Sequence, residues 1–314
     1  MTWAIQVLQE VAAARHILIR CGSTEIDGYA FCSGIRVLKP FKQRHRGLQA
    51  LILPTMSLIR GAVFRRRLNR NEAGQPAKFS LNIRPLGELM DMYHTRKATD
   101  RLDKVYALIG MSSDDPDVAG LKADYNISWK DVMQKLVHFS LSDQISVSTW
   151  DDRGDVVVIE AKAYVLGDVS SSGEIATEDR RQSSDVTRYG RQHVEIAWKN
   201  VPRNFDEMRN STSHIIVPAT AKPIERGDVI CLLRGASAPT IIRPRHGFST
   251  VIMIAVPPTD GLPRWLASIA TFPIDVLLVW DWDESLRKQE GEGDYQDMMS
   301  SRGCPNVLIR SASA

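Results

Sequence analysis

The spacing of apolar residues changes near residue 143, and this change restricts the fold of the chain more than any other feature. Before it, apolar side chains recur every three or four residues, as in "LGELMDMY" (86–93) and "WKDVMQKLVHFS" (129–140). After it, short β-branched runs follow one another, as in "DVVVIEAKAYVLGDV" (155–169) and "IDVLLVWDW" (274–282). A period of about 3.6 residues is typical of helices and a period of about 2 is typical of strands. The sequence therefore predicts an α+β fold with a mainly helical N-terminal half and a β-rich, barrel- or sandwich-like C-terminal half.

Four regions follow from this pattern. Residues 1–35 contain one helix and the strand "HILIRCG", residues 36–142 are a helical connector, residues 143–285 are the β-rich domain, and residues 286–314 are a flexible tail. Within the β-rich domain, the polar segment 170–191 is interpreted as a mobile surface loop between two strands. The apolar side chains of the first helix begin four residues after the N-terminus. The chain thus starts inside a helix, as if cut, and we expect the apolar face of this helix to lack its native cover and to dock on the β-rich half, on another copy or on a protein partner.

Charge and cysteine content exclude several classes of protein. The 40 basic and 37 acidic residues give a net charge of +3, which is too small for a general attraction to nucleic acid or to an anionic membrane. A local basic cluster consists of Arg65, Arg66, Arg67 and Arg70. It is interpreted as the end of a solvated helix, because no aromatic residue is interleaved to stack on bases, and nucleic-acid binding remains an alternative. Four widely spaced cysteines, no signal peptide and no apolar run of about 18 residues predict a cytoplasmic protein without a membrane segment.

The search for catalytic motifs finds no phosphate-binding loop, no dinucleotide fingerprint, no HExxH and no CxxC pair. We therefore expect neither a metal nor a cofactor. The best nucleophile candidate is Cys231, with Asp228 before it and His246 after it, because a thiol needs a nearby base to become a thiolate. The alternative is a buried structural cysteine, since Cys231 alternates with Val229 and Leu233 on a predicted strand. An enzyme of hydrolase-like or biosynthetic type, with its pocket in the β-rich half, thus remains a second hypothesis.

The segment "RKATDRLDKVYALIGMSSDD" (96–115) concentrates acidic and basic residues directly before an apolar run. The spacing of Arg96, Asp100, Arg101, Asp103 and Lys104 permits ion pairs on a helix face. Exposed ion pairs contribute only about 0.3–0.5 kcal/mol each, so stability alone does not explain the concentration of charge. A docking surface is one interpretation, because charges fix register and partner choice more than affinity. A solvated helix start is the other.

Several stretches resemble the fungal heterokaryon-incompatibility (HET domain) proteins. "ATDRLDKVYALIG" (98–110) is similar to a signature that follows the HET core, with Arg101 and Leu102 where the family usually has Pro and Arg. "LQEVAAARHILIRCG" (8–22) resembles the closing motif of the core, with Gln6 in place of its tryptophan. "IERGDVICLLRG" (224–235) and "FPIDVLLVWDWDES" (272–285) resemble later regions. The residues that carry the resemblance are Gln9, Glu10, Asp100, Asp103, Lys104, Tyr106, Ala107, Leu108, Gly110, Gly227, Asp228, Trp280, Asp281 and Trp282.

This resemblance implies a role in nonself recognition and programmed cell death. It also implies that residues 1–35 are the end of a TIR-like core, whose NAD-cleaving relatives use an acid in a pocket. The earlier motifs of the core have no counterpart in this sequence, so Glu10 is the only motif acid and is a weak catalytic candidate. The expected function is a non-catalytic interaction or regulatory module.

Overall fold

The structure is a computed structural model of the 314-residue chain. It describes residues 5–37, 55–56, 58–61, 81–94, 96–115, 120–149, 156–176, 181–188, 212–218, 222–245, 247–256 and 273–282. The chain divides into two compact units. The first contains Met1–Val132 and Ala176–Arg180, and the second contains Met133–Ile175 and Arg181–Ala314. The basic cluster at 65–70, His246 and the tail 286–314 lie outside the described residues, so the predictions made for them stay predictions.

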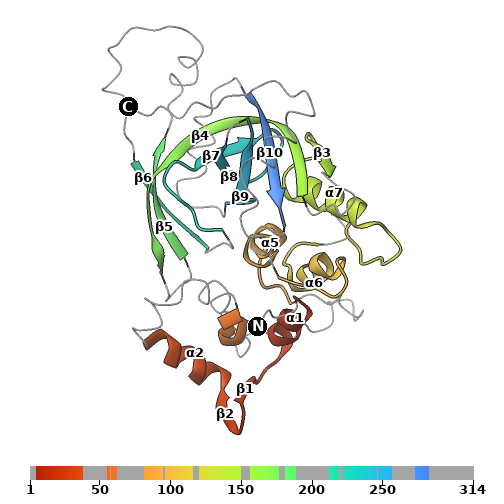
Figure 1. Ribbon diagram of the computed structural model, residues 1–314, viewed down its shortest axis with the longest axis vertical. Helices are drawn as coiled ribbons and strands as arrows, with labels where there is room; N and C mark the ends of the chain where they lie inside the picture. The colour runs from red at the N-terminus through yellow and green to blue at the C-terminus, as the bar shows by residue number, and fades with distance from the viewer. Residues whose placement is uncertain are drawn as a thin grey trace, which may run out of the picture. The chain divides into compact units, whose positions relative to one another are not determined.

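The fold mixes helices and strands, as the sequence predicted, and the change from one to the other falls at the expected place. The last described helix, α7, ends at Ser140, and the strands of the large sheet begin at Ser146. The helices and strands before this point are α1 (Ile5–Ala13), β1 (Leu18–Cys21), β2 (Thr24–Asp27), α2 (Gly28–Val37), α5 (Leu86–Tyr93), α6 (Asp103–Met111) and α7 (Trp129–Ser140). Figure 1 shows these elements in red to yellow-green.

Helix α1 is covered within its own unit, so the expectation that its apolar face lacks its cover was wrong for the side chains that the structure describes. Leu8 and Ala12 are fully buried, and Val11 packs against a small cluster that includes Cys32 and Met56. The cover comes in part from α6, which packs against α1. The sequence could not reveal this packing, because α1 and α6 are about ninety residues apart. The same contact provides the burial that a short helix needs to be stable.

Strands β1 and β2 form a two-stranded antiparallel hairpin. The strand "HILIRCG" was predicted, whereas its partner "TEID" was not. A two-residue loop, Gly22–Ser23, connects the strands, and Gly22 has a φ of 60°. Hairpin loops of this length favour a glycine at the first position because the turn requires a positive φ there. The hairpin leads directly into α2, where Asp27 Oδ1 accepts a hydrogen bond from the N–H of Ala30 at 2.9 Å.

The predicted helices of the connector are confirmed. The predicted face of α5 is buried: Leu86, Leu89, Met90 and Tyr93. The start of α7 has the expected polar cap, because Ser128 Oγ lies 2.7 Å from Asp131 Oδ2 and accepts a hydrogen bond from the Asp131 N–H. On the buried side of α7, Met133, Leu136 and Val137 are fully covered, and Trp129 is half-buried.

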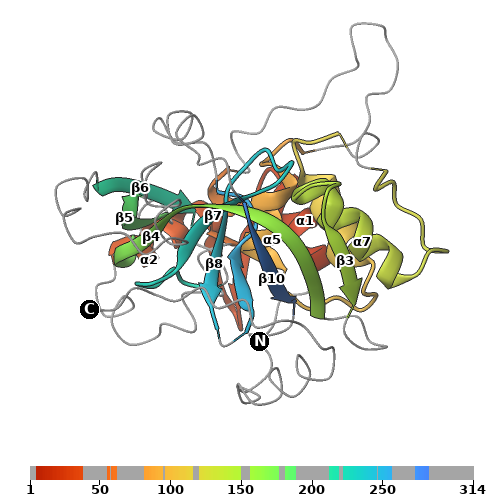
Figure 2. The ribbon, with the colours of Figure 1, turned by 90° about the horizontal axis from the view of Figure 1, so that it is seen from above.

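Among the described residues, the second unit contains an eight-stranded sheet. Its strands are β3 (Ser146–Thr149), β4 (Val156–Ala176), β5 (Arg181–Arg188), β6 (Thr212–Pro218), β7 (Val229–Leu233), β8 (Thr240–Pro244), β9 (Ser249–Met253) and β10 (Ile274–Asp281). The main order is β10-β9-β8-β7-β4-β5-β6, and β3 pairs with β4. The long strand β4 crosses the sheet in Figures 1 and 2.

The sheet curls strongly but is not a closed barrel. β10 pairs with the first half of β4 over eight residue pairs, so the strand order returns toward β4. β10 meets β9 over only two residue pairs, and β4 continues beyond this circuit to β5 and β6. The barrel alternative of the sequence prediction is therefore not confirmed. What holds is the coarser prediction of a β-rich half.

Segment 170–191 is not a loop throughout, and this prediction was wrong. The end of β4 and all of β5 fall inside it. Two serines bond to one residue across the strands: Ser170 Oγ donates to the carbonyl of Asp185 at 3.1 Å, and Ser171 Oγ donates to its Oδ2 at 2.6 Å. The polar composition concealed these strands because cross-strand side-chain bonds replace apolar packing here.

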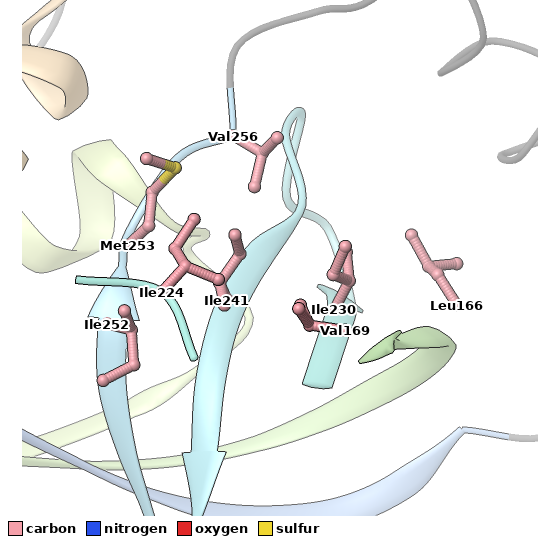
Figure 3. Packing of buried hydrophobic residues seen from close by; sticks show 8 residues of the cluster. All are labelled: Leu166, Val169, Ile224, Ile230, Ile241, Ile252, Met253 and Val256. Atoms are coloured by element: carbon pink, nitrogen blue, oxygen red, sulfur yellow. The ribbon is translucent and has the colours of Figure 1, made fainter. Parts of the chain in front are cut away.

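One buried aliphatic cluster of the second unit lies among its central strands. Figure 3 shows aliphatic side chains converging from β4, β7, β8, β9 and the segment before β7. The cluster consists of Leu166, Val169, Ile224, Ile230, Ile241, Ile252, Met253 and Val256. All eight are buried, so their packing helps to hold these strands together.

Candidate functional site

Segments 8–22 and 98–110 of the first unit contact each other. Gln9 on α1 lies over Gly110 on α6, so closely that a Cβ at position 110 would meet the side-chain amide of Gln9. Neither residue is apolar in the sense of a core side chain, because Gln9 is polar and Gly110 has no side chain. The contact therefore gives the "QE" motif and the "ALIG" end of the signature a shared structural role. Gly110 allows the close approach of α1, since any side chain there would displace the amide.

Two tyrosines and two aspartates organise the other end of α6. Tyr125 donates a hydrogen bond to Asp103 Oδ1 at 2.6 Å, and Tyr106 donates one to the carbonyl of Asp124 at 2.7 Å. The two rings meet edge to face with centroids 5.3 Å apart. The hydrogen bond to Asp103, followed by burial and the nearby negative charges, raises the pKa of Tyr125 to about 12. These contacts tie α6 to the segment that leads into α7.

Most charged side chains of residues 96–104 are buried or make contacts within the fold. Asp100 Oδ1 accepts a hydrogen bond from the N–H of Leu102 at 2.9 Å, just before α6 begins. The guanidinium of Arg101 lies over the ring of Trp129, 5.6 Å from its centroid. Arg96 and Lys104 are buried, and burial lowers the pKa of Arg96. The interpretation as a solvated helix start was therefore wrong for Arg96 and Lys104, and the docking-surface interpretation stays a prediction.

Glu10, the weak catalytic candidate, is exposed on α1. No described contact gives it the hydrogen-bonded or apolar surroundings that prepare a carboxylate for acid or base catalysis. Its neighbour Gln9 is the residue of this motif that takes part in packing.

Cys231 is a core residue of β7. Its side chain is fully buried, and burial raises the pKa of the thiol to about 12. The reactive form of cysteine is the thiolate, so this environment opposes nucleophilic chemistry at neutral pH. Cys231 lies on the same strand face as Val229 and Leu233, as predicted. The positions between them, Ile230 and Leu232, face the aliphatic cluster of Figure 3. Because His246 lies outside the described residues, the complete Cys–His–Asp arrangement is not tested.

Asp228 is engaged by Arg243 rather than poised beside a thiol. Arg243 Nε lies 2.7 Å from Asp228 Oδ1 and its Nη2 lies 3.0 Å from Oδ2, a two-pronged ion pair. Oδ2 also accepts the N–H of Glu225 at 2.8 Å, and Arg243 Nη1 lies 3.1 Å from Glu225 Oε2. Asp228 is 1% exposed. This network closes the turn before β7, in which Gly227 donates its N–H to the carbonyl of Val169.

The remaining motif residues lie at the end of β10 and beyond it. Trp280 and Trp282 are fully buried with ring centroids 5.1 Å apart, and Asp281 between them is also buried. Residues two apart on a strand share a face, so the tryptophan pair contributes packing to one side of the sheet.

The described part of the chain offers neither a metal centre nor a membrane-spanning helix. No group of three or more His, Cys, Asp or Glu side chains in it is arranged to hold a metal ion. None of its helices has both the length and the apolar character that crossing a membrane requires. His16 Nε2 lies 3.4 Å from Asp27 Oδ2.

Comparison with family models, with curated proteins and with solved structures gives no match for this chain.

Proposed function

We propose that the chain is a heterokaryon-incompatibility-type protein that acts as a non-catalytic interaction or regulatory module in fungal nonself recognition and programmed cell death. The observation that carries the proposal is the contact between Gln9 and Gly110. Two segments that resemble the family separately meet in space, and the match at Gly110 acquires a physical reason. A chance resemblance in two short segments gives no reason for such a contact.

The contacts of the other motif residues support the same proposal. Asp100, Asp103 and Tyr106 bond within the fold, and Asp228 is held by Arg243. Groups committed to such bonds position backbone and neighbouring elements. Because these side chains are occupied by structural bonds, the motif residues favour a binding module over an enzyme.

The test is expression of the chain in a filamentous fungus that also carries a full-length HET-domain protein. We expect the chain to change the extent of the incompatibility reaction, measured as growth and cell death after contact with an incompatible strain. The Gly110→Leu variant should lose this effect because leucine separates α1 from α6. Gly34→Leu is the matched control, since Gly34 is exposed and a Cβ there meets no atom within 4 Å.

A wild-type chain without any effect on the reaction would contradict the proposal. Hydrolysis of NAD by the purified chain, abolished by Glu10→Ala, would contradict the non-catalytic part of it.

A further inference from the structure

The β1–β2 hairpin concentrates exposed apolar side chains. Leu18 is 57% exposed, Ile26 is 41% exposed, and Tyr29, directly after the hairpin, is 48% exposed. In the described part of the chain, one other large apolar side chain, Tyr125, is exposed to this extent. Within that part, β1 and β2 pair with each other and with no third strand. Exposed apolar groups beside open strand edges are a common basis of protein association.

The backbone groups on the two edges can be assigned from the hydrogen bonds. Gly28 donates its N–H to the carbonyl of Ile17 at 2.8 Å, so Ile17 and Gly28 form a hydrogen-bonded pair. Ile19 and Ile26, two residues further along the ladder, form the next hydrogen-bonded pair. Bonded and non-bonded pairs alternate in an antiparallel ladder. The pairs Leu18 with Asp27 and Arg20 with Glu25 are therefore the non-bonded ones, and their N–H and C=O groups point outward.

The two edges carry opposite charges. The outward positions of β1 are Leu18 and Arg20, and those of β2 are Glu25 and Asp27. Arg20 and Glu25 already lie 3.4 Å apart within the hairpin, and both remain at least half exposed. If β2 of a second copy paired with the β1 edge, a second acidic side chain would lie beside Arg20. If β2 of one copy paired with β2 of another, acidic side chains would lie opposite each other.

We propose that a second copy of this chain binds through the hairpin, with the β1 edge of one copy pairing antiparallel with the β2 edge of the next. In the same register as within the hairpin, Arg20 then lies opposite Glu25 of the next copy, Ile19 lies opposite its Ile26 and Leu18 lies opposite its Asp27. The row of charge pairs and the row of isoleucines on the other face both continue. Because the two edges differ, the pairing is head-to-tail and does not close at two copies. The inference names a partner for the interaction module proposed above and rests on that proposal only for its biological role.

The test is sedimentation velocity of the full chain over a range of concentrations. We expect the average mass to rise continuously beyond that of a dimer and to fall when salt is added, because exposed charges are screened. Glu25→Pro should weaken the association by at least about tenfold, since proline removes an outward N–H while the bonded pairs of the hairpin remain. Glu25→Gln, which keeps this N–H and removes only the charge, is the matched control and should weaken the association less.

A charge exchange keeps the proposal testable if Glu25→Pro does not fold. Arg20→Glu alone should weaken the association, and Arg20→Glu combined with Glu25→Arg should restore it, with circular dichroism confirming the fold of each variant. A mass that stays at one copy, a mass that stops at two copies, or an association unchanged by these variants would overturn the proposal. None of these outcomes bears on the Gly110→Leu test, so the two proposals fail separately.

Discussion

The side-chain amide of Gln9 lies directly over Gly110, and this contact joins two helices that are far apart in the sequence. Glycine is an unfavourable residue inside a helix, where alanine is more stable by about 0.5–1 kcal/mol. Because Gly110 has no side chain, it leaves room for the Gln9 amide. The packing of α1 on α6 therefore offsets a local cost in α6.

Alanine at position 110 tests this account. Gly34→Ala should stabilise the protein by about 0.5–1 kcal/mol, because it adds a helix-favouring residue in α2 where a Cβ meets no atom within 4 Å. Gly110→Ala should gain less than this or lose stability, because its Cβ displaces the Gln9 amide. In a Gln9→Ala background the gain at position 110 should return, which a cycle of urea denaturation measurements would show. Equal effects at both glycines would contradict the proposed contact.

Removal of one partner from the ion pair of Asp228 and Arg243 should strongly destabilise the second unit. Arg243→Met leaves the buried carboxylate of Asp228 without its cation, and we expect a loss of about 3–5 kcal/mol in the free energy of unfolding. Arg243→Lys should fall between this variant and the wild type, since lysine cannot form both prongs. Lys162→Met is the control, because Lys162 and Asp275 form an exposed pair. Similar losses at both sites would argue against a special role for Asp228.

Cys231 should not react in the native protein. With the pKa of the thiol raised to about 12, almost no thiolate exists at neutral pH. In a Cys21→Ser, Cys304→Ser background, a thiol reagent should label Cys231 only after denaturant is added, as measured by mass spectrometry. Cys21 is exposed and should react readily in the wild-type chain, which provides the internal reference. Rapid labelling of native Cys231 would favour the enzyme hypothesis instead.

Tyr125 should ionise at unusually high pH. Its hydrogen bond to Asp103 requires the protonated phenol, and the pKa rises from 10.0 to about 12. A raised tyrosine pKa means that the bond contributes fully below pH 10 and is lost as the pH rises toward 12. The difference between alkaline absorbance titrations of wild type and Tyr125→Phe isolates this group, and Asp103→Asn should move it toward the ordinary value. Titration of Tyr125 near pH 10 in the wild type would refute this.

Local features were predictable from the sequence, and long-range ones were not. Helix α7 was predicted because Ser128 and Asp131 cap it and its apolar residues follow helical spacing, all within a few residues. The β1 strand was predicted, while β2 was missed although the Gly22–Ser23 loop is a hairpin signal. The burial of Leu8 and Ala12 could not be predicted, because it depends on helices distant in sequence.

The candidate site shows the same division. The alternation of Cys231 with its apolar neighbours correctly indicated a buried strand. Asp228 was interpreted as a possible partner of the thiol because the two residues are close in sequence. Its actual partner, Arg243, lies on the neighbouring strand β8, and only the pairing of β7 with β8 brings the two charges together. Spacing along the chain contains no direct information on such a register.

Strand β4 pairs at its start with β10, which comes more than a hundred residues later in the chain. During synthesis, the apolar start of β4 can therefore pair with β3, which precedes it, but its other edge stays open until the ribosome has released β10. Until then Val156–Ile159 lack part of the cover that they have in the finished sheet, and such segments are prone to aggregate or to bind chaperones. The yield of folded protein in a cell should thus depend on how quickly translation reaches Asp281.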